Sequence, residues 1–455
     1  MHGSPPAPSK AAPSAVAYAL IQHSDPEAIF AFRAGRPVTA GAFLRDVAAL
    51  AAVLPARQHV LNLCADRYRF AVGLAAALCR EQVTLLPPND MSGTLAALAG
   101  DFPDLYCLED GRPGAPSLLA VAVPDEFVGA PSLSAIPVLP AGQPAVLLFT
   151  SGSTGRPKPA PKSWGTLARS AIAAGRRLGV DSLPSAVVVG TVPHQHSYGL
   201  ESTVLLAFQH GLALQAERPF YSGDVVAALQ SVERPRILVT TPIHIRALLA
   251  EGDAVPRADL IISATAPLTH DLAVEAEKRF SAPLIEIYGC SEAGQVATRR
   301  TALERGWHCL EGIALRQDKH GTWAAGPPVE TETLLHDVIE LSDSASFFLH
   351  GRSADLVNIG GKRSSLAHLD HQLTSIEGVL DGAFLMPDDS DRGITRLIAF
   401  AVAPGLSTDA ILAALRARID SIFLPRPLVL VDSLPRTNLG KLPRQALLQL
   451  ASRSS

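Results

Sequence analysis

Short apolar runs alternate with amphipathic stretches between residues 145 and 288. The runs are AVLLF (145–149), AVVVG (186–190), RILVT (236–240), DLIIS (259–263) and PLIEIY (283–288). Helical spacing occupies the segments 163–178, 224–232, 243–250 and 269–280. Because strands that alternate with helices form a parallel sheet covered on both faces, the runs of 145–288 predict a mainly parallel sheet. The expected class is an α/β fold with mainly parallel sheets flanked by helices.

Two loops leave the carboxyl ends of apolar runs in this region. Thr150 follows AVLLF directly, and Gly289 follows PLIEIY directly. Ligands of parallel sheets collect at the carboxyl ends of the strands. We therefore expect both loops to open onto one crevice.

The pattern changes after Gly351. The segment GRSADLVNIGGKR is rich in turn residues, and it precedes a helix near 366–376, a strand over 397–403 and a helix near 408–422. These elements predict a small α+β domain over 351–455 beside a large domain over 1–350. The first 15 residues are rich in Pro and Ala and are predicted to be a disordered tail.

Composition narrows the classes of partner. The 455 residues are enough for two or three hydrophobic cores, and a charged fraction of 18% with a net charge of −4 offers no basic surface for nucleic acid or anionic lipid. No apolar stretch approaches the roughly 20 residues that span a bilayer. The N-terminus lacks the features of a signal peptide, and the five scattered cysteines suit reduced thiols, so we expect a cytoplasmic protein without structural zinc.

The segment TSGSTGRPK is the first candidate for chemistry. It sets hydroxyl groups among glycines and ends in a lysine: Thr150, Ser151, Gly152, Ser153, Thr154, Gly155 and Lys158. Glycines let backbone N–H groups converge on an anion, and the hydroxyls and the lysine add donors. It is not a Walker A loop, because Arg156 and Pro157 separate the last glycine from the lysine. Taken alone, such a loop could equally be a surface turn.

TSGSTGRPK resembles the phosphate-binding signature of the adenylate-forming superfamily, which includes acyl-CoA synthetases, peptide-synthetase adenylation domains and luciferases. YGCSE (288–292) is similar to the YGxTE motif of that superfamily. The resemblance implies that Tyr288 packs on adenine, that Gly289 and Ser291 also contact the nucleotide, and that Glu292 binds Mg²⁺. Ser291 replaces the usual threonine but keeps its hydroxyl.

Two upstream segments resemble the walls of the substrate site. SATAP (263–267) is similar to the small-residue segment beside adenine and the acyl group, which implies nucleotide contacts from Thr265 and Ala266. PHQHSYGL (193–200) resembles the loop that borders the acyl pocket, with His196 at the gate position. Without that resemblance, both histidines of this loop would be interpreted as ordinary loop residues, because no carboxylate or cysteine completes a metal site.

Motifs near the C-terminus supply the remaining charged residues. IELSD (339–343) aligns with the TGD motif, which implies that Asp343 accepts hydrogen bonds from the ribose and that Arg352 is the second ribose contact. LPRTNLGKLPR (434–444) resembles the motif that carries the catalytic lysine, here Lys441. The hinge should lie near 351–355, although Ala354 stands where the superfamily usually has Asp or Lys.

These motifs imply a two-step reaction. The substrate carboxylate attacks the α-phosphate of ATP, pyrophosphate leaves, and the acyl adenylate then passes its acyl group to the thiol of CoA or of a carrier-protein phosphopantetheine. Positioning and charge neutralisation dominate such a reaction. Lys441 would bridge the carboxylate and the α-phosphate, and the small domain would rotate between the two steps.

The acid is suggested by a closer resemblance. The segments 193–221, 288–300 and 355–366 resemble compact bacterial AMP-ligases of aryl polyene and xanthomonadin-type pigment pathways, which implies a hydroxybenzoate-type acid and an acyl carrier protein as a partner. A short-chain or medium-chain fatty acid is the alternative. Residues beside the motifs are the candidates for the acyl pocket: Tyr198, Glu201, Thr241, Ser263, Ala264 and Gln295.

Two other classes of protein compete with a ligase. GCSEAG (289–294) comes within one residue of the nucleophile elbow of a serine hydrolase, but it has Ala293 where that motif needs Gly. A non-catalytic binding module with the same fold would tend to lose charged site residues. All of those are present here: Lys158, Glu292, Asp343, Arg352 and Lys441.

Overall fold

The computed structural model describes residues 16–111, 118–127, 135–150, 158–250, 255–352, 356–359, 362–387, 396–437 and 442–453. The predicted tail (1–15), most of the predicted phosphate loop (151–157), the centre of the predicted hinge (353–355) and Lys441 lie outside these described residues.

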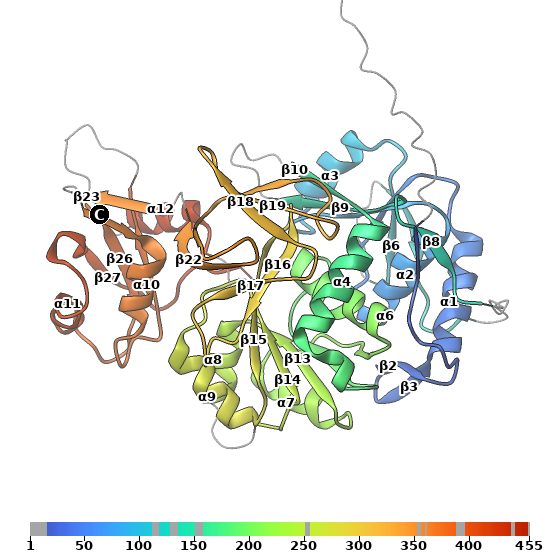
Figure 1. The fold of residues 1–455 in the computed structure, drawn as a ribbon, viewed down its shortest axis with the longest axis horizontal. Helices are drawn as coiled ribbons and strands as arrows, with labels where there is room; N and C mark the ends of the chain where they lie inside the picture. Colours follow the sequence, from blue (N-terminus) through green and yellow to red (C-terminus); the bar gives the residue numbers. More distant parts are fainter. Residues whose placement is uncertain are drawn as a thin grey trace, which may run out of the picture.

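A six-stranded sheet forms one layer of the larger part of the chain (Figure 1). Its order is β10-β9-β5-β4-β6-β7, and every pairing is parallel except that of β9 with β10. The strands are β4 (His59–Asn62), β5 (Val83–Leu86), β6 (Tyr106–Glu109), β7 (Leu119–Ala122), β9 (Pro144–Thr150) and β10 (Lys158–Ser163). The predicted phosphate loop therefore joins two antiparallel neighbours.

An eleven-stranded sheet forms a second layer, in the order β21-β22-β17-β16-β15-β14-β13-β11-β12-β2-β3. Pairings from β2 to β15 are parallel, whereas β3 and the strands from β16 onward pair antiparallel. The strands are β2 (Ile29–Arg33), β3 (Arg36–Thr39), β11 (Val187–Gly190), β12 (Ala213–Gln215), β13 (Arg236–Thr240), β14 (Leu260–Ser263), β15 (Leu284–Cys290), β16 (Gly294–Arg299), β17 (Trp307–Cys309), β21 (Asp337–Leu341) and β22 (Ser346–Arg352).

Helices α2 and α4 touch strands of both sheets, so a helical layer lies between them. The helix α4 begins where the Ser163 side chain accepts a bond from the Thr166 amide, and it ends at Gly179, whose φ of 72° suits glycine. The helices of this part are α1 (Ala40–Val53), α2 (Arg67–Cys79), α3 (Ser92–Asp101), α4 (Trp164–Leu178), α5 (Ser197–Gly199), α6 (Leu206–His210), α7 (Ser222–Gln230), α8 (Pro242–Ala250) and α9 (His270–Phe280).

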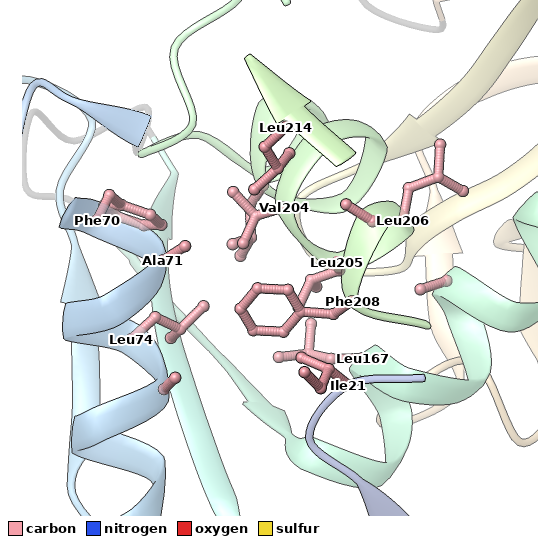
Figure 2. Packing of buried hydrophobic residues seen from close by; sticks show 14 of the residues in the cluster. Ile21, Phe70, Ala71, Leu74, Leu167, Val204, Leu205, Leu206, Phe208 and Leu214 are labelled. Atoms are coloured by element: carbon pink, nitrogen blue, oxygen red, sulfur yellow. The ribbon is translucent and has the colours of Figure 1, made fainter. Parts of the chain in front are cut away.

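The largest hydrophobic cluster fills the space between the two sheets. Figure 2 shows Phe70 and Leu74 of α2 facing Phe208 of α6, with Leu167 of α4 and Ile21 beside them. These aromatic and aliphatic side chains are buried, and Phe70 and Phe208 are fully so. This packing fixes the two sheets relative to each other and so positions the loops at their edges.

The part of the chain beyond residue 351 packs around its own clusters. Two clusters there take all their buried members from residues 357–447. β25 pairs antiparallel with β26, and β26 pairs parallel with β27 (Figure 1, orange to red). The elements are β23 (Leu356–Ile359), β24 (Lys362–Ser365), α10 (Leu366–Thr374), β25 (Asp381–Leu385), β26 (Ile398–Val402), α11 (Thr408–Arg416), β27 (Leu428–Leu430) and α12 (Arg444–Arg453).

The predicted α/β class with mainly parallel sheets is confirmed, with two corrections in detail. The strands of 145–288 do not share one sheet, because β9 lies in the six-stranded sheet and β15 in the eleven-stranded one. The helix predicted over 408–422 ends at Arg416, and a short 3-10 helix follows it over Ser421–Phe423. The Asp420 carboxylate accepts the Ile422 amide there, which gives that backbone an alternative to continuing α11.

Smaller strands complete the structure: β1 (Ala17–Ala19), β8 (Val138–Pro140), β18 (Ala314–Asp318), β19 (Gly321–Ala325) and β20 (Thr333–Leu335). Within the described ranges, every helix is too short or too polar to cross a bilayer.

Candidate active site

The motif YGCSE occupies the end of β15 and the turn that leads into β16. Gly289 pairs with Gln295 across this hairpin, and Ser291, Glu292 and Ala293 form the turn. A Cβ on Gly289 would lie 2.2 Å from the Gly294 carbonyl oxygen, so the close approach of the two strands requires glycine. The turn leaves the Glu292 side chain exposed to solvent.

Lys162 of β10 is buried and contacts the backbone of this turn. Its side chain is only 3% exposed, and its Nζ donates a 2.5 Å hydrogen bond to the Glu292 carbonyl oxygen. Burial lowers the pKa of the Lys162 ammonium, while the nearby Glu201 carboxylate opposes that shift. This contact brings the strand that follows the predicted phosphate loop against the turn that carries the predicted magnesium ligand.

Lys162 is not among the residues that the motifs predict, although the strand pattern contains a signal for it. In β10 the buried positions are Ala160 and Lys162, two residues apart and thus on the same face of the strand. A lysine in an apolar register is costly to bury without partners. Lys158 begins the same strand, is exposed, and lies opposite Thr150 in the β9–β10 register.

Glu201, predicted to line the acyl pocket, is buried and accepts several hydrogen bonds. It lies in the π-helical segment η2 (Leu200–Leu205), a geometry that is frequent at functional sites. Its carboxylate accepts bonds from Ser197 Oγ (2.5 Å), Ser170 Oγ (3.3 Å) and the Gln295 backbone amide (3.1 Å). Gln295, a second pocket candidate, is also buried and donates through Nε2 to Ser202 Oγ at 3.0 Å.

Tyr288 is held by an aromatic cluster and by Asp337. Its ring centroid lies 5.6 Å from that of Trp307 and 5.5 Å from that of Phe347, and its hydroxyl donates to Asp337 Oδ2 at 2.6 Å. The ring is 9% exposed, so most of its faces are already in contact with protein. Asp337 begins β21 directly opposite Arg352 at the end of β22.

Asp343 and Arg352, predicted to bind one ribose together, lie at opposite ends of the β21–β22 hairpin. Asp343 is exposed in the turn, where it accepts bonds from the Ala345 amide and from Ser346 Oγ, both at 2.7 Å. The Ser346 hydroxyl bond and the Ala345 amide bond lower the pKa of Asp343. From Ser346 to Arg352 the strand runs roughly 20 Å, so the backbone positions of Asp343 and Arg352 are far apart. In the strand register it is Asp337, rather than Asp343, that stands opposite Arg352.

The small-residue segment follows β14 at the carboxyl end of the parallel sheet. Ser263 is fully buried, and its hydroxyl has no hydrogen-bond partner within the described part of the chain. Ala264 is 6% exposed and Ala266 is half-buried. Thr265 has a φ of 77°, a strained conformation for a β-branched residue that persists chiefly at functional sites. Contacts with the surrounding structure must therefore hold the backbone of this turn in its strained conformation.

The loop before η2 carries Tyr198, a predicted pocket residue, and His196, predicted at the gate of that pocket. The hydroxyl of Tyr198 lies 3.0 Å from the carbonyl oxygens of both Thr240 and Ile262, and burial raises its pKa well above the usual range, so it is a neutral donor. His196 is half-buried just before α5. Thr241, the remaining pocket candidate, lies 2.9 Å from His244 Nδ1 through its hydroxyl.

His194 is the buried histidine of this loop. Its Nε2 lies 2.9 Å from the Cys64 carbonyl oxygen, and burial holds its pKa well below the usual range. Neutral imidazole suits metal binding in general, but within the described ranges no group of three His, Cys, Asp or Glu side chains could hold a metal ion.

The donor set at the turn suits magnesium that is bound together with a nucleotide. Glu292 offers one exposed carboxylate. Mg²⁺ is commonly held by one or two carboxylates while substrate phosphates and water supply the other ligands, so a single carboxylate is sufficient. Nearby Cys290 is no competitor as a ligand, because burial raises the pKa of its thiol to about 11.

The hairpin also excludes the serine hydrolase. A nucleophile elbow requires a sharp turn from a strand into a helix. Ser291 lies instead in a turn between the antiparallel strands β15 and β16. The serine of GCSEAG therefore lacks the setting that activates such a nucleophile.

The chain is similar in sequence to a known family of enzymes. The profile of the family described as AMP-binding enzyme matches residues 13–337. A 4-coumarate–CoA ligase from Rhodobacter capsulatus is 30% identical over 64% of this chain and 73% of that protein. A 2-succinylbenzoate–CoA ligase from Listeria monocytogenes is 25% identical over 67% of this chain and 69% of its own length.

A solved structure shares the fold over nearly the whole chain. ATP-bound MatB from Rhodopseudomonas palustris superposes with a TM-score of 0.81 over 94% of this chain and 97% of its own, at 18% sequence identity. The likeness extends past residue 350, where the family profile no longer matches.

Proposed function

The chain belongs to the AMP-binding enzyme family, and from this membership we propose that it converts an aromatic carboxylic acid to an acyl adenylate with ATP and Mg²⁺, then transfers the acyl group to CoA. The superfamily predicted from TSGSTGRPK and YGCSE is confirmed by the family match, and the relatives are named as CoA ligases. One contact supports the proposal most directly. Lys162 joins the strand after the phosphate loop to the turn of Glu292.

The reaction needs little covalent chemistry from the protein. The substrate carboxylate is already ionised at neutral pH, so its oxygen attacks the α-phosphorus without a general base, and the bond to pyrophosphate breaks. The loop from Thr150 to Lys158 would bind the phosphates through N–H, hydroxyl and ammonium donors. Glu292 would hold Mg²⁺, which supplies positive charge to the leaving pyrophosphate. Lys441 would bridge the carboxylate and the α-phosphate.

Asp337 takes the ribose role in this proposal, in place of Asp343. Its carboxylate is adjacent to Tyr288, the expected adenine contact, and its position in β21 is opposite Arg352. A ribose next to adenine would meet Asp337 as an acceptor in β21 and Arg352 as a donor in the neighbouring strand β22. The Tyr288 hydroxyl would then orient that acceptor, while its ring edge and the small residues Thr265 and Ala266 border the base.

An aromatic acid is favoured over a fatty acid. The two sequence relatives above are named for 4-coumarate and 2-succinylbenzoate, both aromatic acids. The walls proposed for the acyl pocket are Tyr198, Thr241, Ser263 and Ala264, with His196 at the entrance. The Ser263 hydroxyl, which has no hydrogen-bond partner among the described residues, offers a buried hydrogen bond to a polar ring substituent, of the hydroxybenzoate type, that an alkyl chain would leave unmade.

We also propose that residues 351–455 form a mobile domain that brings Lys441 to the nucleotide and then withdraws it for thiolysis. Support comes from the separate clusters of that part of the chain. CoA is the favoured acceptor because the relatives are CoA ligases. A carrier-protein phosphopantetheine presents the same thiol and is the second candidate.

ATP–pyrophosphate exchange tests this proposal. The purified chain is assayed with a panel of hydroxybenzoates, cinnamates and fatty acids of two to ten carbons, then with CoA or with a phosphopantetheine-loaded carrier protein. We expect exchange with aromatic acids and thioester formation with CoA. Best exchange with an alkyl acid would favour the fatty acyl ligase instead, and no exchange with any acid would favour a non-catalytic binding module.

A further inference from the structure

Two buried residues of opposite charge bind the backbone at Glu292 and at Gln295, within and just after the turn that carries Glu292. We propose that Lys162 and Glu201 are positioning residues for this turn, and that together they set the direction in which Glu292 presents its carboxylate to Mg²⁺ and ATP. The proposal rests on the proposed function, because it assigns how that same nucleotide site is built.

Lys162 fixes the centre of the turn. Its Nζ donates to the carbonyl oxygen of Glu292, the residue whose side chain is exposed above. The register of β10 makes this a core-facing position, shared with Ala160, that an aliphatic side chain would fill at lower desolvation cost. An ammonium retained at 3% exposure is explained by the bond that it makes.

Glu201 fixes the far end of the turn from the side of η2. Its Oε2 accepts the backbone amide of Gln295, the residue that follows Gly294 at the start of β16. Gly294 has a φ of 82°, and a Cβ there would lie 3.2 Å from the same Oε2, so the carboxylate packs directly against the backbone. Hydroxyls of Ser197 and Ser170 complete the carboxylate's bonds and hold it in place.

The two contacts constrain complementary backbone groups. Lys162 binds a carbonyl oxygen at position 292, and Glu201 binds an amide at position 295, so the backbone between them is tethered at both ends. With its backbone fixed, Glu292 retains only side-chain rotation. Support of a metal ligand by such outer contacts typically changes metal affinity by about 10- to 100-fold.

Calorimetric titration of the protein with ATP, once with Mg²⁺ and once with EDTA, gives the affinity for ATP in each condition without any turnover. The quantity compared is the factor by which Mg²⁺ strengthens ATP binding. For Lys162→Met we expect that factor to fall by about tenfold or more, with binding in EDTA unchanged. Lys278→Met, an exposed lysine of α9, is the matched control and should keep the wild-type factor.

A second variant separates positioning from folding. Lys162→Met leaves Glu201 as a buried charge, which can itself destabilise the chain, whereas Lys162→Met/Glu201→Gln removes both charges. We expect the double variant to unfold near the wild-type temperature and still to show the reduced Mg²⁺ factor. A wild-type Mg²⁺ factor in the folded double variant would overturn the proposal. Failure of the wild-type chain to bind ATP under either condition would instead count against the proposed function.

Discussion

The hydroxyl of Tyr288 donates a 2.6 Å hydrogen bond to Asp337, which stands opposite Arg352 in the β21–β22 hairpin. This relationship joins the end of β15 to the first residue of β21, 49 positions later in the chain. It also separates two aspartates that the sequence presents as equivalent candidates. Asp343 belongs to the hairpin turn, and its carboxylate is occupied by Ala345 and Ser346.

Asp337→Asn and Asp343→Asn should therefore differ in ATP binding. A charged acceptor that bonds the ribose contributes about 1.5–3 kcal/mol, so we expect Asp337→Asn to raise the KM for ATP by about 10- to 100-fold. Asp343→Asn should change it by less than about twofold. Steady-state kinetics with varied ATP compare the two, and the opposite ranking would restore Asp343 as the ribose contact.

Lys441→Ala should abolish adenylation and spare the second step. The ammonium is expected to act on the α-phosphate and the incoming carboxylate, neither of which reacts during thiolysis. ATP–pyrophosphate exchange should fall by about 10³-fold, whereas thioester formation from a supplied acyl adenylate and CoA should stay within about threefold. Equal losses in both half-reactions would refute the role.

Gly289→Ala should distort the hairpin that carries Glu292. The new Cβ would meet the Gly294 carbonyl oxygen at 2.2 Å, and that backbone cannot move without breaking the β15–β16 pairing. We expect a loss of about 1–3 kcal/mol in the free energy of unfolding, together with weaker ATP binding. Gly142→Ala is the control, because a Cβ there has nothing within 4 Å. Similar urea midpoints for the two variants would contradict the structure.

Acid should destabilise the chain partly through His23. Burial lowers the pKa of His23 from 6.5 to about 4, while the Leu212 carbonyl opposes that shift. The unfolded state therefore binds the proton more readily, so the contribution is complete above pH 6.5 and is lost as the pH falls from 6.5 to about 4. Its size is on the order of 3 kcal/mol.

Urea unfolding between pH 4 and 7.5 measures this contribution. His23→Gln keeps a donor for the Leu212 carbonyl but does not titrate, so the unfolding free energy of this variant should depend less steeply on pH. His320→Gln, at an exposed turn position, should keep the wild-type slope. Parallel curves for His23→Gln and the wild type would assign the acid sensitivity to other groups.

Local patterns in the sequence located five strands and four helices between residues 145 and 288. RILVT was placed over 236–240, where β13 lies, and the helix predicted over 269–280 is α9 within one residue. Such patterns record whether a side chain is buried, and burial repeats with the period of each element. They do not record which strands become neighbours, so the division into two sheets was missed.

The motif TSGSTGRPK, with YGCSE downstream, determined the family without any structure, because both segments keep the residue types that phosphate and magnesium require. Tertiary structure alone decided which residues surround them. Asp337 of β21 lies beside Tyr288, and Lys162 of β10 lies beside Glu292, through hairpin register and strand pairing that depend on contacts far apart in the chain. Side-chain identity is local, whereas proximity is a property of the whole packed chain.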